Sequence, residues 1–460
     1  MPGPIILAPK TDIVHGPVNL VYVGLASLVA ATSGLLFGFD IAVINGALLF
    51  LKQQFALSEV QTEFAATSLL AGCVVGAAFG GGLSDRFGRR KVLIFSAILF
   101  AFSSIGAAIP RTLTEFVIAR VAGGIAIGVA SVLAPLYIAE VSPAHIRGRL
   151  VSLNQMAIVT GILLAYLVNW SLSSLGPESW RWMFAVAAIP SLLFLIALFF
   201  VPESPRWLTE NGQETEALRV LTKVSNPAQA EIEMKAIREV IAEESGTLAE
   251  LFQPGYRRAI WLAIALAILQ QWTGINTVLF YGSIIMKEQV GGQSESAAIG
   301  ANVLIGLINF LCTIIAIWLI DKLGRKPLLI FSAAGMAVAH AGLAWAFLQT
   351  PRPGMVIVGL MLLCAACFAV GLGPGVWVVL SEIFPTRIRG RAMSIATVAL
   401  WIACVILTFT YLSIASALGP SGAFGIYGVM CLITIWIVVK FTPETKGHSL
   451  EEIERIWKKN

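Results

Sequence analysis

Apolar runs of about 20 residues follow one another along this chain, and their length limits the folds it can adopt. A helix needs about 20 such residues to cross a hydrocarbon core, and inside lipid the backbone must satisfy its own polar groups. Only 12% of the residues are charged, against roughly a quarter in soluble domains. The sequence therefore predicts an all-α integral membrane protein with twelve transmembrane helices. The predicted spans lie near 20–48, 62–83, 91–109, 115–138, 152–173, 182–201, 258–286, 297–320, 328–348, 355–380, 391–414 and 422–441.

Lysine and arginine are distributed unevenly between the loops. With both termini on one side of the bilayer, about 25 of the 31 basic residues fall on that side. Cytoplasmic loops carry such an excess, so the pattern predicts a multi-pass protein of the plasma membrane with both termini cytoplasmic. The stretch from Met1 to Pro17 lacks the pattern of a cleaved signal peptide. The formal charge of +5 therefore reports orientation, and no nucleic-acid partner is expected.

Three short motifs occur twice, in the same order and about 240 residues apart. The pairs are DRFGRR (85–90) and DKLGRK (321–326), EVSPAHIRGR (140–149) and EIFPTRIRGR (382–391), and PES (202–204) and PET (443–445). Paired halves are the architecture of transporters that rock around a central site. We therefore expect two pseudo-symmetric six-helix bundles, residues 1–201 and 257–441. A cytoplasmic helical linker, 202–256, joins them, and a cytoplasmic tail, 442–460, follows.

Longer motifs resemble those of one transporter family. They are GLSDRFGRRK (82–91), PLYIAE (135–140), PESPRWL (202–208), QQWTGIN (270–276) and PETKG (443–447). Each is weak alone, but in this order the chain resembles the sugar porter family of the major facilitator superfamily, in particular its bacterial glucose and xylose symporters. The resemblance implies the fold of that superfamily and proton-coupled symport of a monosaccharide by alternating access. No cofactor besides the coupling proton is implied, and we expect a functional monomer.

Uncharged polar side chains inside the spans are candidates for sugar binding. Gln and Asn amides both donate and accept hydrogen bonds, as sugar hydroxyls do, without burying a charge. Gln270 and Asn276 would converge only if the helix breaks near Gly274, and such breaks are common at transporter sites. For any single amide, the alternative is a hydrogen bond that joins helices. By the resemblance, the sugar-contacting positions are Gln155, Gln270, Gln271, Asn276, Asn309 and Trp377.

Asp40 and Arg120 are ionisable residues within predicted spans. Charge at membrane depth is expensive, so a functional role is the default interpretation. A carboxyl binds its proton differently beside an arginine than away from it, so a conformational change that separates the pair would load or release a proton. The resemblance agrees, because the position of Asp40 is a carboxylate in proton-coupled sugar porters and typically an amide in mammalian facilitative ones. The alternative is a static salt bridge between the first and fourth spans.

Charged residues at the cytoplasmic ends of the helices are predicted to form a breakable inner gate. Partly hydrated ion pairs are worth only about 0–1 kcal/mol each, which suits a contact that must open. The resemblance implies the same role, and the alternative is that these charges only set topology. The predicted gate residues are Asp85, Arg86, Glu140, Arg147, Asp321, Glu382 and Arg389.

Other features indicate packing. Gly72, Gly76 and Gly80 form a small-residue ladder, which favours close helix approach. A lone hydrogen-bonded histidine is the interpretation for His340, and Trp401 is expected to pack. All six cysteines lie in apolar runs, so a disulfide framework is not expected.

Three other functions remain open. A sugar uniporter would keep the amides and make Asp40 structural. A non-transporting sugar sensor would be expected to carry a long signalling tail, and the chain ends about 20 residues after the last span. We find no nucleophile, metal cluster or phosphate loop that would support an enzyme. Two departures from the family pattern, Phe280 and Leu400, remove polar groups and leave the identity of the sugar open.

Overall fold

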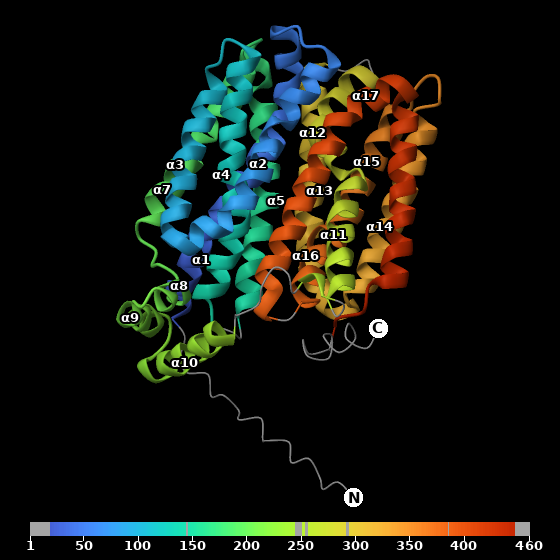
Figure 1. The fold of residues 1–460 in the computed structure, drawn as a ribbon. Coiled ribbons are helices and arrows are strands. Elements are labelled where there is room, and N and C mark those ends of the chain that lie inside the picture. Colours follow the sequence, from blue (N-terminus) through green and yellow to red (C-terminus); the bar gives the residue numbers. More distant parts are fainter. Residues whose placement is uncertain are drawn as a thin grey trace, which may run out of the picture.

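The structure is a computed structural model that describes residues 19–143, 146–243, 251–253, 256–290, 294–384 and 386–446. Within these ranges every regular element is a helix, as predicted. The helices form two bundles that stand side by side and run roughly parallel (Figure 1). Large apolar side chains cover the outside of both bundles. Phe79, Phe102 and Phe200, for example, are 65%, 71% and 81% exposed, as expected for a surface that faces lipid.

Six spans make up the first bundle. They are α1 (Leu20–Gln54), α2 (Glu59–Phe87), α3 (Arg89–Ala108), α4 (Leu113–Val141), α5 (Arg147–Leu172) and the pair α6 (Ser179–Val186) with α7 (Ala188–Leu198). Local sequence sets several of these boundaries. Ser58 and Gln61 form a capping box at the start of α2, and Gly88, at φ 99°, allows the turn from α2 into α3.

The second bundle repeats this plan, and its seventh and tenth spans are each divided into two helices. Its helices are α11 (Arg257–Trp272), α12 (Ile275–Ile284), α13 (Glu295–Leu323), α14 (Arg325–Ala346), α15 (Gly354–Val370), α16 (Leu372–Glu382) and α17 (Thr386–Phe441). A π-helical turn, Ile285–Val290, continues α12. The eleventh and twelfth spans both lie in α17, which turns at Gly419 with φ 73°. Within the described residues, eleven helical stretches are long and apolar enough to cross a membrane, and because the last of them contains two spans, these stretches supply the twelve predicted spans.

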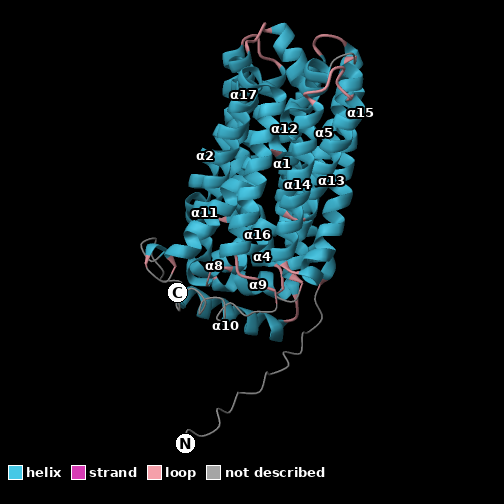
Figure 2. Cartoon of the chain, turned by 90° about the vertical axis from the view of Figure 1, so that its right-hand side faces the viewer, coloured by secondary structure: helices cyan, strands magenta, loops and turns pink. Residues whose placement is uncertain are grey.

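In the sequence, three short helices connect the two bundles: α8 (Pro205–Glu210), α9 (Glu214–Val224) and α10 (Pro227–Glu243). These helices have a small core of their own and sit at one end of the first bundle (Figure 1). The backbone N–H of Asn19, just before α1, donates to the Val224 carbonyl at 2.9 Å. We call this end of the molecule the linker end and the opposite end the far end (Figure 2).

The glycine ladder lets α2 and α4 approach closely, as predicted. A Cβ atom at Gly72 would lie 2.8 Å from the Cα of Gly124 in α4, closer than packed atoms tolerate. Gly76 meets the backbone around Gly128 in the same way. Close backbone contact through small residues supplies packing where lipid gives no hydrophobic drive.

Hydrogen bonds between the two bundles gather toward the far end. Asn45 of α1 donates to the Leu279 carbonyl of α12 at 2.7 Å, and its amide oxygen accepts from the Ser283 N–H at 3.0 Å. Tyr166 of α5 donates to the same Leu279 carbonyl at 2.9 Å. At the rim, the Lys52 ammonium lies 2.7 Å from the Glu288 carboxylate. These bonds join the far halves of the helices, so the far end is closed.

Candidate functional site

A broken helix in the second bundle positions three of the predicted amides. α11 ends at Trp272, Gly274 adopts φ 85°, and α12 begins at Ile275, so the predicted break is confirmed. Gln270 and Gln271 lie before the break and Asn276 after it. Because the break replaces regular helix by a turn, side chains from both segments can meet.

The three amides form one hydrogen-bonded chain. The Asn276 amide donates to the Gln271 Oε1 at 2.5 Å, and the Gln271 Nε2 donates to the Gln270 Oε1 at 3.0 Å. Asn276 also donates to the Cys404 sulfur at 3.1 Å. Gln270, Gln271 and Asn276 are only 2%, 8% and 7% exposed. Each amide is thereby oriented by its neighbour, which leaves the remaining lone pairs and N–H groups in fixed directions.

The last amide of this hydrogen-bonded series, Gln270, binds at a second helix break, in the tenth span. α15 ends at Val370 and α16 begins at Leu372. The Gln270 Nε2 donates to the carbonyls of Leu372 and Gly373 at 2.8 and 3.0 Å. The predicted aromatic residue Trp377 lies one turn further along α16 and is partly buried. The two broken spans are thus tied together at membrane depth.

The other predicted amides do not join this chain. Gln155 in α5 is half-buried, and Asn309 in α13 is 7% exposed. Neither side-chain amide has a hydrogen-bond partner in the part of the chain that the structure describes. Both therefore keep their donors and acceptors available for a ligand or for water.

Sequence reasoning missed Cys404 of α17 near the amides, whereas Trp401 of the same helix packs as expected. Cys404 accepts the bond from Asn276, and Trp401 packs against Phe37 of α1 with ring centroids 5.5 Å apart. The Trp401 indole N–H is buried and has no partner among the described residues.

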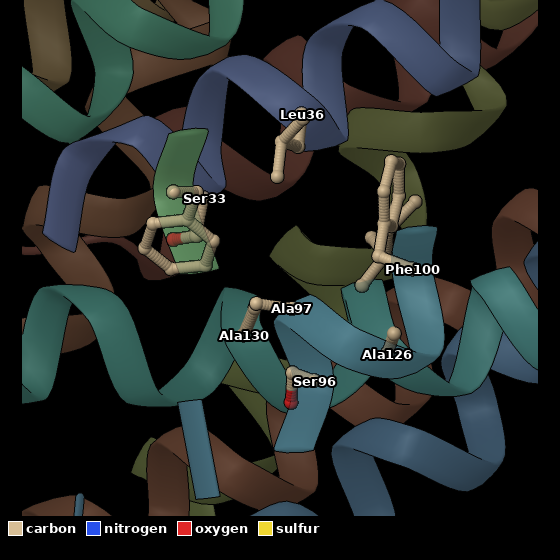
Figure 3. Close-up of a pocket in the computed structure, with 9 residues that line it drawn as sticks. Ser33, Leu36, Ser96, Ala97, Phe100, Ala126 and Ala130 are labelled. Atoms are coloured by element: carbon tan, nitrogen blue, oxygen red, sulfur yellow. The ribbon is translucent and has the colours of Figure 1, made fainter. Parts of the chain in front are cut away.

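A small void in the first bundle is a poor alternative site. It lies between α1, α3, α4 and α7 and is lined mainly by Leu36, Phe100 and alanines (Figure 3). Its two serine hydroxyls already donate within their own helices, Ser33 to the Ala30 carbonyl and Ser96 to the Val92 carbonyl. The lining therefore offers little to a polyol.

The predicted ion pair forms within the first bundle. Arg120 of α4 donates through Nη1 to a carboxylate oxygen of Asp40 in α1, and through Nη2 to the Asp40 carbonyl at 3.1 Å. Asp40 is 4% exposed and Arg120 is 1% exposed. The guanidinium also lies over the Phe184 ring, 5.1 Å from its centre, and its Nε has no partner among the described residues. The pair is buried and held from several sides.

At the linker end, the predicted gate carboxylates pair within their own bundles. Glu140 pairs with Arg89 at 3.0 Å, and Arg89 also lies 3.1 Å from Asp85. In the second bundle Glu382 pairs with Arg325 at 2.9 Å. Sequence reasoning missed both arginines, although they occupy matching positions of the repeated DRFGRR and DKLGRK motifs.

The other predicted gate residues form weaker contacts or lie outside the description. The Arg86 guanidinium lies 5.3 Å from the centre of the Phe87 ring, and Arg147 donates to the Ser142 carbonyl at 3.5 Å. The side chains of Asp321 and Arg389 lie outside the described residues.

The repeated Pro-Glu motifs cap helices. Glu203 accepts from the backbone N–H of Arg89 and of Arg90, at the start of α3. Glu444 accepts from Arg325 and Lys326 at the start of α14, both at 3.1 Å. Partial burial raises the pKa of Glu444, but bonds from backbone N–H groups outweigh this and leave the pKa below its ordinary value. A carboxylate at a helix N-terminus is favoured by the exposed N–H groups there.

His340 supports the break in the seventh span. Its Nε2 donates to the Thr273 carbonyl at 2.7 Å, a group that the break frees from the helical ladder. The imidazole stacks on Phe424 and meets Tyr427 edge-on, with centroids 5.9 and 5.8 Å away. The hydrogen-bonded core histidine expected from the sequence is confirmed, and its partner is the Thr273 carbonyl at the helix break.

Comparison with known proteins gives concordant matches over nearly the whole chain. A family model described as "Sugar (and other) transporter" matches residues 26–457. The chain is 40% identical to the D-xylose-proton symporter of Escherichia coli (strain K12), over 95% of this chain and 96% of that protein. It is 39% identical to the arabinose-proton symporter of Bacillus subtilis (strain 168), over 95% of each.

A solved structure matches the fold. The proton:xylose symporter XylE of the major facilitator superfamily, bound to 6-bromo-6-deoxy-D-glucose, superposes with a TM-score of 0.82 at 40% identity. The match covers 95% of this chain and all of that one.

Proposed function

Because this chain belongs to the sugar transporter family, we propose that it carries a monosaccharide together with a proton across the membrane by alternating access. The observation that carries the proposal is the amide chain at two helix breaks, in a molecule that also buries an Asp–Arg pair. Relatives named as proton symporters of D-xylose and of arabinose support both parts. A glucose- or xylose-like sugar is the expected substrate, and the chain is a transporter rather than an enzyme.

The sugar site is proposed to lie between the bundles, around the amide chain. Gln270, Gln271 and Asn276 would present fixed donors and acceptors, while Gln155 and Asn309 would contribute amides that no protein group occupies. Trp377 would supply an apolar face for the sugar ring, which carries C–H groups as well as hydroxyls. A site that replaces the water around each hydroxyl is required for a polyol to leave solution.

Proton coupling is proposed to reside in Asp40 and Arg120. With the pair closed, the guanidinium satisfies the Asp40 carboxylate and its carbonyl together. A carboxylate left without that partner in a dry helix interior would take up a proton, because unpaired buried charge is costly. Separation of α1 from α4 in the outward-facing state would therefore load Asp40, and closure would release the proton.

The orientation is proposed from the loop charges. The linker end carries the excess of lysine and arginine, so it faces the cytoplasm, and the far end faces outward. With the far end closed, the structure corresponds to a carrier whose site faces inward. The ion pairs of Glu140 and Glu382 would then exchange partners across the bundles when the inner side closes, as an inner gate. A monomer contains the whole proposed site.

The proposal is tested by uptake of labelled hexoses and pentoses into proteoliposomes, with and without an imposed pH gradient. Parent protein should accumulate one or more of these sugars when the outside is acidic. Asp40→Asn should lose this gradient-driven accumulation and keep sugar counterflow, because the amide chain is intact. Equal gradient-driven accumulation by both proteins would remove proton coupling through Asp40. Counterflow with no accumulation by the parent would favour the uniporter.

A further inference from the structure

A buried carboxyl group near the outer end of a membrane helix, Glu63, plays no part in the function proposed above. Glu63 lies in the first turns of α2, four residues after the helix begins at Glu59, or about 6 Å from its far end. Its side chain is fully buried, at 0% exposed. Ionisable groups inside membrane helices are costly, and they are retained where they contribute to function.

Both oxygens of the Glu63 carboxylate are bound by one residue of the other bundle. The Ser413 backbone N–H of α17 donates to Oε1 at 2.8 Å, and the Ser413 hydroxyl donates to Oε2 at 2.6 Å. Among the described residues, no lysine, arginine or histidine forms an ion pair with Glu63. Its polar partners therefore belong to the opposite bundle, and they are lost whenever α2 and α17 separate.

The other polar contacts between the bundles differ from this one. The Lys52–Glu288 pair lies at the rim, where the two side chains are 27% and 41% exposed, and such pairs contribute little. The Gln53 amide donates to the Glu295 carboxylate at 2.8 Å, but this bond is likewise exposed. Asn45, Ser283 and Asn302 form bonds between neutral groups. Hydrogen bonds to a carboxylate are roughly twice as strong as neutral ones, and the Glu63 side of these bonds is fully buried, although Ser413 is exposed.

We propose that Glu63 is a gating residue for transport, a latch that holds the outer ends of the bundles together in the inward-facing state. This inference rests on the proposed transport function and on the outward orientation of the far end. Opening to the outside must break both bonds to Ser413 and must hydrate the carboxylate in the new outer cavity. Glu63 thereby sets the balance between inward-facing and outward-facing states without contacting the amide chain.

Three substitutions separate the parts of this latch. Glu63→Ala removes both bonds. Ser413→Ala removes the hydroxyl and keeps the backbone N–H donor. Glu63→Gln retains an acceptor for the N–H and a polar partner for the hydroxyl. Lys52→Ala is the matched control, because it breaks a contact between the same bundles at the exposed rim.

Hydrogen–deuterium exchange of the purified full chain, without sugar or pH gradient, provides the test. In Glu63→Ala, peptides from the far ends of α2, α12 and the first half of α17 should exchange about tenfold faster than in the parent, because loss of bonds to a charged group shifts the equilibrium by at least that factor. Peptides from the linker ends of α4, α5 and α16 should exchange more slowly, since the inner side closes as the outer side opens. Ser413→Ala and Glu63→Gln should be intermediate, because Gln keeps both partners but makes neutral bonds to them, and Lys52→Ala should resemble the parent.

Two results would overturn the proposal. One is unchanged exchange at the far ends in Glu63→Ala. The other is faster exchange at both ends, which would indicate lost stability instead of a displaced equilibrium. In a double-mutant cycle, Glu63→Ala combined with Ser413→Ala should exchange no faster than Glu63→Ala alone. Because no sugar is present, failure here leaves the transport proposal standing, and failed sugar transport leaves this result interpretable.

Discussion

Replacing Gln270 and Gln155 by leucine should separate amides that shape the site from amides that are free for a sugar. The Gln270 amide forms its hydrogen bonds within the protein. It donates to the carbonyls of Leu372 and Gly373 and accepts from the Gln271 amide. Gln155 has no such partner among the described residues and is only half-buried. Both substitutions remove an amide of the same size, so they form a matched pair.

The expected loss of stability follows from what each substitution leaves unpaired. Gln270→Leu strips the donor from two buried carbonyls at the tenth-span break and an acceptor from Gln271. A buried polar group left without a partner costs about 1–3 kcal/mol, so we expect a loss of roughly 2–5 kcal/mol after partial rearrangement. Gln155→Leu leaves no protein group unpaired, and its effect on stability should stay within about 0.5 kcal/mol.

Thermal unfolding in detergent, followed by intrinsic tryptophan fluorescence, measures the first effect, and sugar titration measures the second. Gln270→Leu should lower the midpoint clearly and weaken sugar binding. Gln155→Leu should keep the parent midpoint without sugar. Its affinity for the sugar should fall about tenfold, which corresponds to the loss of one neutral hydrogen bond. Equal midpoints for the two variants would refute the assignment of Gln270 as the residue that ties the two broken spans together.

Three further outcomes are expected. Gly72→Val should destabilise the protein by roughly 1–3 kcal/mol because its side chain would overlap the α4 backbone, whereas Gly81→Ala in the same helix, with open space around it, should be neutral in the same melting assay. His340→Ala should lower the melting midpoint by leaving the Thr273 carbonyl with only the long contact from the Cys431 thiol, while His340→Gln, which can still donate, should recover part of the loss. The pKa of Glu444 is lower in the folded protein than in the unfolded chain. The carboxylate therefore stabilises the fold fully above its unfolded pKa, and this stabilisation is lost as the pH falls through its folded pKa. The difference in midpoint between the parent and Glu444→Gln should therefore be constant near pH 7 and shrink below about pH 4.

The fold was predictable because membrane helices are specified by simple rules. Apolar length gave the spans, and the repeated motifs gave two bundles. The eleventh and twelfth spans were separable from sequence even though one continuous helical element contains them, since Gly419-Pro420 marks the turn. The break near Gly274 was predictable from chemistry, because two amides six residues apart cannot share one face of an unbroken helix.

The partners of the site residues were less accessible to sequence reasoning. Glu140 and Glu382 were predicted as gate residues, but the arginines that hold them, Arg89 and Arg325, lie more than 50 positions away. Nothing in the spacing distinguishes these arginines from their basic neighbours.

Glu63 was overlooked for a related reason. It lies in the first turns of a helix that begins with Glu59, where acidic residues are common and favour the helix N-terminus. Only the packing of α2 against α17 shows that Glu63 is buried and bound by the other bundle.

The central claim is that the two bundles enclose a site that carries a monosaccharide from one side of the membrane to the other. It is tested most directly by counterflow: purified protein in vesicles loaded with unlabelled glucose or xylose, with a trace of the labelled sugar outside. We predict a transient rise of labelled sugar inside above its outside concentration, absent from protein-free vesicles. If no tested hexose or pentose enters faster than in protein-free vesicles, the carrier function proposed for these amides is wrong.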